Sequence, residues 1–91
     1  MFVVHCQDKP GAAQVRLDNR AAHLDYLKAN LARVAMAGPV QTDDRQGMVG
    51  SVLVLDFADR AELDAFLAGD PYAKAGLFAS VTVLPYKKVL P

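Results

Sequence analysis

The stretch Arg16-Leu-Asp-Asn-Arg20-Ala-Ala-His23-Leu-Asp-Tyr26-Leu27 decides how this chain folds. Leucines recur in and just after it at positions 17, 24, 27 and 31, and these spacings of three, four and seven residues are typical of a helix with one apolar face. We expect this helix to begin near Arg20 and to end near Leu31, with the leucine stripe directed at a core. Asp18 or Asn19 is the candidate N-cap.

His23 lies at the border of this stripe and shares a helix face with Leu27, one turn later. An imidazole in that position should be partly shielded from water and still reachable. This is a setting in which histidine can act as an acid or a base near neutral pH. A histidine at a helix edge is more often a packed, hydrogen-bonded residue, so the catalytic and the structural interpretations both stay open at this point.

Composition limits the classes of protein to consider. The chain has 91 residues, of which 53% are hydrophobic, and we treat residues 1–91 as a single domain. This apolar content is high for a small domain, so we expect part of the surface to be covered in a homodimer. Ten basic and ten acidic residues give a net charge of +0, which argues against nucleic acid and anionic membranes as partners.

Cys6 is the only cysteine, which excludes an internal disulfide and a zinc site of the Cys/His type. Asp43 and Asp44 are adjacent acids in a polar loop, but no further oxygen ligands are spaced to join them, so we expect no metal site. The start of the chain does not resemble a signal peptide, and no apolar run is long enough to span a bilayer. We therefore expect a cytoplasmic protein.

The remaining elements follow from alternation and turn signals. Asp59 followed by Glu62 predicts a helix start, and Gly69 predicts its end. We expect strands at residues 2–7, 33–40, 48–57 and 81–86, helices at 20–31 and 59–69, and a helical turn within 70–78. This β-α-β-β-α-β order predicts an α+β fold of the ferredoxin-like class, with two helices on one face of a four-stranded antiparallel sheet. A second copy would then line the other face.

Asp70 is a candidate partner for His23. An aspartate followed by Pro71 is what the start of a short helix favours, which could by itself explain the residue. The same carboxylate could also accept a hydrogen bond from an imidazole and thereby fix its tautomer. Spacing in the sequence does not show whether the two side chains meet.

Three other positions have weaker signals. Ser51 precedes a buried strand without the context of a nucleophile, so we interpret it as a hydrogen-bonding group. Gly38, before Pro39, predicts a bulge or bend that interrupts its strand, with close approach of a ligand as the alternative. Tyr26, Tyr72 and Phe78 are expected to be packing residues.

Short motifs occur in a specific order along nearly the whole chain. They are Asp8-Lys9-Pro10, Arg16 and Arg20 ahead of His23-Leu24-x-Tyr26-Leu27, Ala37-Gly38-Pro39, Gly50-Ser51, Asp70-Pro71-Tyr72-x-Lys74-Ala75-Gly76-Leu77-Phe78 and Pro85-Tyr86-Lys87-Lys88-Val89. Together these motifs resemble the YciI-like (YCII-related) family. The family often has a proline shortly before the histidine, where this chain has Ala21 and Ala22.

The resemblance implies a dimeric α/β barrel of ferredoxin-like protomers, similar to muconolactone isomerase, with a pocket beside a His–Asp pair. Carried to this chain, the pair is His23 and Asp70, and Arg20, Gly38 and Ser51 stand where they could bind substrate. One characterised type of protein in this family removes chloride from a chlorinated hydroxyhydroquinone.

The sequence therefore predicts a small cofactor-independent enzyme of the lyase or isomerase type that acts on a small cyclic or aromatic substrate. In this prediction His23 is the acid or base and Asp70 orients it. The alternative is a non-catalytic domain that binds a small molecule in the same pocket or assists a neighbouring enzyme.

Overall fold

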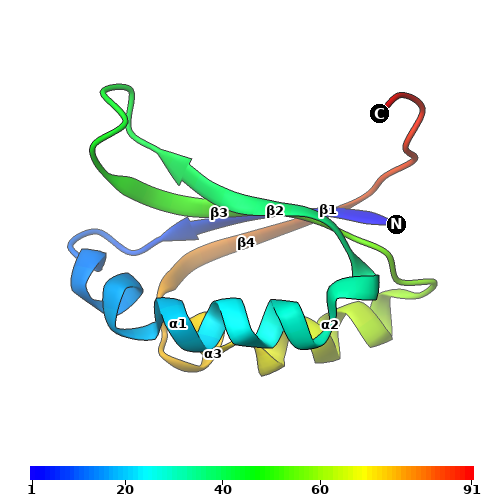
Figure 1. Cartoon of the computed structure of the whole chain (residues 1–91), viewed down its shortest axis with the longest axis horizontal. Coiled ribbons are helices and arrows are strands. Elements are labelled where there is room, and N and C mark those ends of the chain that lie inside the picture. Colours follow the sequence, from blue (N-terminus) through cyan, green and yellow to red (C-terminus); the bar gives the residue numbers. More distant parts are fainter.

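A computed structural model describes all 91 residues as a four-stranded sheet with helices packed on one face (Figure 1). In chain order its elements are β1 (Phe2–Asp8), α1 (Ala13–Ala29), the short 3-10 helix η1 (Leu31–Arg33), β2 (Val34–Gln41), β3 (Met48–Leu55), α2 (Arg60–Gly69), α3 (Pro71–Lys74) and β4 (Phe78–Pro85). The sheet has the order β2-β3-β1-β4, and every neighbouring pair of strands is antiparallel. This topology confirms the predicted α+β fold of the ferredoxin-like class.

Helix α1 departs from its predicted bounds, because it begins at Ala13 and ends at Ala29. The N-cap is Ala12, without a side-chain hydrogen bond, so the assignment of the cap to Asp18 or Asn19 was wrong. Both residues lie inside the helix. Asp18 there accepts a hydrogen bond from the Gln14 amide, and the Asn19 amide donates to a backbone carbonyl one turn back. Short polar side chains that favour caps can satisfy their hydrogen bonds in this way within a helix.

The leucine stripe of α1 is also rotated from its expected direction. Leu17 and Leu31 are 66% and 65% exposed, whereas the buried residues of the helix are Arg16, His23 and Leu27. Two polar side chains therefore occupy the face that packs toward the sheet. This composition is unusual for a core-facing helix surface, where leucine, isoleucine and valine dominate.

The core lies between the sheet and the helices. Its buried cluster consists of Val4, Cys6, Leu27, Leu53, Leu55, Phe57, Leu63 and Phe66. Most of these side chains belong to the central strands β1 and β3 or to α2. The predicted start and end of α2 are confirmed, since the Asp59 carboxylate accepts a hydrogen bond from the Glu62 amide at 2.8 Å and the helix ends at Gly69.

Strand β2 is continuous through Gly38 and Pro39, so the predicted interruption there was wrong. Gly38 pairs in register with Val52, and the irregularities of this ladder lie near its two ends instead. Proline is tolerated here because β2 is an edge strand, where one side of the backbone has no strand partner to receive a hydrogen bond.

The second face of the sheet, which we call the open face, is not covered by any helix (Figure 1). Across this face Met36, Val54, Val3 and Leu84 form one row that runs through all four strands. Met36 and Leu84, at the ends of the row, are 64% and 56% exposed. The four strands together contain a single charged residue, Asp8, which lies at the end of β1.

We predict that Cys6 makes the protein sensitive to alkaline pH. Burial, together with the negative charge of Asp70, raises the pKa of the Cys6 thiol from 9.0 to about 12. Between these values the unfolded chain releases the thiol proton while the folded chain keeps it, so the free energy of unfolding should fall as pH rises. Urea denaturation at a series of alkaline pH values checks this expectation.

The Cys6→Ala variant is the control, because it lacks the titrating thiol. It should be less stable than the wild type near neutral pH, owing to the lost packing, but its stability should fall less steeply above about pH 9. Parallel pH dependence of the two proteins would contradict the buried, protonated thiol.

Candidate functional site

A cavity of about 340 Å³ lies between α1, the β2–β3 part of the sheet and the start of α3. Its apolar wall includes Leu24, Leu27, Leu53, Pro39 and Met48. Its polar side chains are Arg16, Arg20, His23, Ser51 and Tyr72. The volume suits a single small ring, and the mixture of apolar walls with a few polar groups is typical of a small-molecule site.

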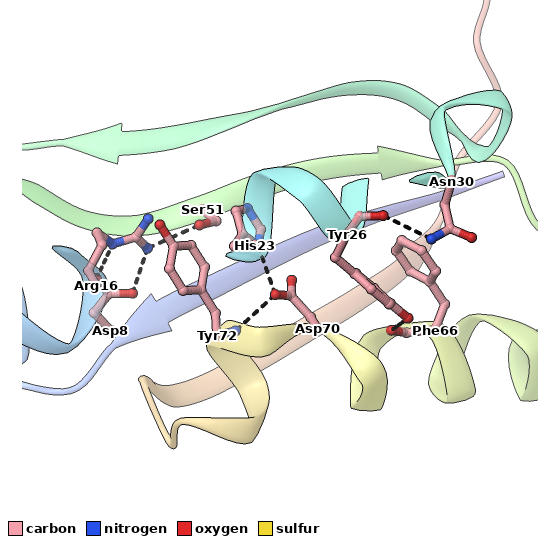
Figure 2. A network of polar contacts seen from close by, with 9 residues as sticks. All are labelled: Asp8, Arg16, His23, Tyr26, Asn30, Ser51, Phe66, Asp70 and Tyr72. Atoms are coloured by element: carbon pink, nitrogen blue, oxygen red, sulfur yellow. Dashed lines mark hydrogen bonds and ion pairs between the residues drawn. The ribbon is translucent and has the colours of Figure 1, made fainter. Parts of the chain in front are cut away.

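His23 lines this cavity and contacts Asp70, as Figure 2 shows for the two side chains. The distance from His23 Nδ1 to Asp70 Oδ1 is 2.8 Å, and the two side chains are 9% and 5% exposed. The same Oδ1 atom accepts a hydrogen bond from the Tyr72 backbone amide at 2.9 Å. One carboxylate therefore caps α3 and contacts the imidazole at the same time.

The contact with Asp70 leaves the other ring nitrogen of His23 available. A carboxylate accepts hydrogen bonds, so the proton of a neutral imidazole resides on Nδ1 and the lone pair on Nε2. Every buried side-chain nitrogen or oxygen has a hydrogen-bond partner, whereas Nε2 has none and is therefore not sealed in the interior. Since His23 lines the cavity, Nε2 can take a proton from a molecule bound there.

Tyr72 holds the imidazole in place from its side. The two rings are stacked with centroids 3.9 Å apart and an angle of 15° between their planes. The Arg16 guanidinium carbon lies 4.8 Å from the centroid of the Tyr72 ring, and Figure 2 shows the tyrosine between Arg16 and His23. The expectation that Tyr72 only packs was thus incomplete, because this side chain also lines the cavity.

Arg16 forms a second buried polar cluster with Asp8 and Ser51. Its Nε and Nη2 atoms donate to the two carboxylate oxygens of Asp8, each at 2.8 Å, and Nη2 also donates to Ser51 Oγ at 3.0 Å. The side chains of Arg16 and Asp8 are 7% and 6% exposed. This bidentate pair attaches the end of β1 to the first turn of α1.

The charge states in the cavity follow from these contacts. Burial lowers the pKa of Arg16, but the hydrogen bond and charge of Asp8 outweigh burial, so the pKa lies above its ordinary value and the guanidinium stays charged. Burial raises the pKa of Tyr72 above 10.0 despite the opposing charge of Arg16. The phenol is therefore protonated at neutral pH.

The predicted substrate-binding residues Arg20, Gly38 and Ser51 all line the cavity, while Asp70 lies behind His23 and outside its lining. Asp8, Arg16 and Tyr72 were not predicted as site residues. The spacing of Arg16, Arg20 and His23, at i, i+4 and i+7, was a usable signal, because it puts the three side chains on one helix face.

No group of three or more His, Cys, Asp or Glu side chains is arranged to hold a metal ion. No helix combines the length and the apolar character needed to cross a membrane.

Comparison with known proteins gives consistent matches over nearly the full chain. The family model described as "YCII-related domain" matches residues 1–87. Protein YciI of Escherichia coli is 33% identical over 96 residues, which span 98% of each chain. A Haemophilus influenzae protein is 36% identical over 95 residues, with 97% of each chain covered.

The solved structures include a similar protein with a named activity. This is the 5-chloro-2-hydroxyhydroquinone dehydrochlorinase of Burkholderia phenoliruptrix AC1100, in complex with 2,5-dihydroxybenzoquinone. It is 39% identical, has a TM-score of 0.88, and is aligned over 94% of this chain and 92% of its own.

We predict that the buried Asp8–Arg16 pair is far more important to stability than an exposed pair of the same residue types. Arg16→Gln leaves the Asp8 carboxylate buried without its cation, which should lower the free energy of unfolding by about 3–5 kcal/mol. Urea denaturation at neutral pH measures this loss.

The matched control is Arg60→Gln, because Arg60 pairs with Asp64 at 2.9 Å and both side chains are 57% exposed. That substitution should change stability by less than about 1 kcal/mol. Equal losses in the two variants would show that burial of the Asp8–Arg16 pair has no special energetic role.

Proposed function

We propose a function from the premise that this chain belongs to the YCII-related family. The protein is a small enzyme of the lyase or isomerase type that acts on a hydroxylated ring. In this proposal His23 transfers protons and Asp70 orients it. The observation that carries the proposal is the unpartnered Nε2 of His23, which faces a cavity the size of one ring while Nδ1 contacts Asp70.

The named relative supports the chemistry. A dehydrochlorinase removes hydrogen chloride, and the Burkholderia enzyme that does so from a chlorinated hydroxyhydroquinone has the same fold at 39% identity. We infer that this chain catalyses a comparable loss of a proton and a leaving group. Its substrate would be an aromatic ring with two hydroxyl groups para to each other and with the leaving group ortho to one of these hydroxyls.

Such an elimination needs proton transfer alone. A proton from the hydroxyl ortho to the leaving group moves to the carbon that bears this group, and the hydroxyl becomes a carbonyl. Removal of the para hydroxyl proton then pushes electrons through the intervening double bond and expels chloride. The sum is loss of one hydrogen chloride and formation of a quinone, so no external oxidant is required. His23 Nε2 can accept and return these protons from one position.

Asp70 would assist without touching the substrate. Its carboxylate keeps the Nδ1 proton in place, so that Nε2 presents a lone pair, and it stabilises the imidazolium that forms when Nε2 takes a proton. The stacked Tyr72 ring limits rotation of the imidazole, which keeps Nε2 directed at one point of the cavity.

We also propose that the chain forms a homodimer through the open face of its sheet. Met36 and Leu84, at the ends of the apolar row, are 64% and 56% exposed and would otherwise stay in water, and the strands put no formal charge on that face to oppose association. A second copy of this chain offers the same uncharged surface, as a twofold interface requires.

We predict that His23→Gln lowers chloride release from 5-chloro-2-hydroxyhydroquinone by about 10²–10⁴-fold, because the substitution removes the acid–base group. Asp70→Asn should also lower the rate, while its melting temperature stays near that of the wild type, because asparagine still caps α3. Ion-selective measurement of chloride and thermal unfolding give the two readouts.

The control is Asp59→Asn, which changes the cap of α2 outside the cavity and should leave the rate unchanged. Full activity of His23→Gln would contradict the proposed mechanism. Binding of the ring compound without any chloride release by the wild type would instead favour the alternative, a non-catalytic binding domain.

We predict that Leu84→Asp converts the homodimer to monomers, because each copy would put a charge in the interface. Sedimentation velocity measures the mass. The exposed Leu31, in η1 on the helix side of the sheet (Figure 1) and outside the cavity, provides the matched control Leu31→Asp, which should remain dimeric. A monomeric wild type would contradict the proposed assembly.

A further inference from the structure

Two hydroxyls that line the cavity donate to no group of the protein. Ser51 is 3% exposed, and its Oγ accepts a hydrogen bond from Arg16 without donating one. Tyr72 is 2% exposed as a residue, but its phenol oxygen has no hydrogen-bond partner and is therefore not sealed in the interior, since every buried side-chain nitrogen or oxygen has one. Both hydroxyl protons can thus be donated to a ligand that takes the place of water in the cavity.

The cavity offers these donors no carboxylate. Its lining contains Arg16 and Arg20 but no aspartate or glutamate. Neither hydroxyl donates to Asp8, whose two oxygens each accept a hydrogen bond from Arg16, and Asp70 lies behind His23. A molecule that displaces water from the cavity therefore has to supply the acceptor itself.

Positive charge reinforces the two donors. Arg16 donates to Ser51 Oγ and lies over the Tyr72 ring, which makes both hydroxyls stronger donors. Arg20 has no ion-pair partner, and its charge acts on the Tyr72 phenol in the same sense as that of Arg16. The phenol remains protonated at neutral pH because burial outweighs both charges, so it can donate.

We propose that Ser51 and Tyr72, supported by Arg16 and Arg20, form a receptor for a negatively charged ring oxygen, so that the substrate binds as a phenolate or enolate. This inference rests on the proposed function and specifies its substrate class. Because Tyr72 is stacked on His23, the receptor adjoins Nε2 and can bind one ring oxygen while Nε2 exchanges a proton with the same ring. Charge that grows on this oxygen during elimination would be stabilised by donors already in position.

The test uses 4-nitrocatechol, a coloured ring whose neutral and anionic forms absorb at different wavelengths. Absorbance titrations at pH values below and above its ionisation midpoint give the affinity for each form. The wild type should bind the anion more tightly, so that the ionisation midpoint of the bound ring lies below that of the free ring. Tyr72→Phe and Ser51→Ala should each lower the affinity for the anion by at least about tenfold, the usual effect of losing a hydrogen bond to a charged group.

Two substitutions serve as matched controls. Tyr26→Phe removes a phenol that donates to the Phe66 carbonyl at 2.8 Å outside the cavity, and Ser80→Ala removes an exposed hydroxyl on β4. Neither should change the affinity for the anion. Circular dichroism shows whether each variant is folded, and Ser51→Ala still tests the receptor if Tyr72→Phe is unfolded.

Equal or tighter binding of the neutral ring would overturn the proposal, as would an anion preference that persists without either hydroxyl. This result is distinguishable from failure of the proposed function, since the titration requires no turnover. Anion binding without chloride release supports the proposed receptor and contradicts the proposed enzymatic function. Chloride release without a preference for the anion supports the enzymatic function and contradicts the receptor.

Discussion

The arrangement of this site depends on one oxygen atom, Oδ1 of Asp70, which contacts the His23 ring and the Tyr72 backbone amide. The first contact joins α1 to the short helix α3, and the second caps α3 through the amide of Tyr72, the residue whose ring is stacked on the imidazole. Hydrogen bonds to a charged group contribute about 1.5–3 kcal/mol each, so this carboxylate is a substantial part of the packing between these helices. Position and orientation of the imidazole are thereby set by the same group.

Polar residues on the inner face of α1 impose a further constraint. Arg16 and His23 occupy positions where apolar side chains would otherwise pack, so the core is supplied mainly by β1, β3 and α2. Each buried polar group of α1 has its own partner, Asp8 for the guanidinium and Asp70 for the imidazole. Because a buried charge without its partner costs several kcal/mol, Asp8 is as necessary to the fold as to the cavity.

The order of strands and helices along the chain, the cap at Asp59 and the fold class could be predicted from the sequence, because they follow from alternation, local hydrogen bonds and the small number of folds that accept such an order. The start of α1 could not, since Asp18 and Asn19 are good caps that here bond within the helix. Arg20, Gly38 and Ser51 line the cavity, and their role in binding substrate stays a prediction. The pairing of Arg16 with Asp8 was invisible, because it depends on how the chain turns between β1 and α1 and not on a recognisable spacing.

The strands contain few charged residues, and this affects how the edges of the sheet behave in a monomer before it dimerises. Many proteins keep sheet edges from joining other chains by placing lysines there, and the outer strands β2 and β4 contain no lysine. Strand β2 instead contains Pro39 in its middle, and β4 ends at Pro85, and neither proline nitrogen has a hydrogen to donate. Protection against fibre-like association along the two edges therefore relies on gaps in the rows of backbone donors, and the edge that remains more open to misassociation is β4, whose proline lies only at its end.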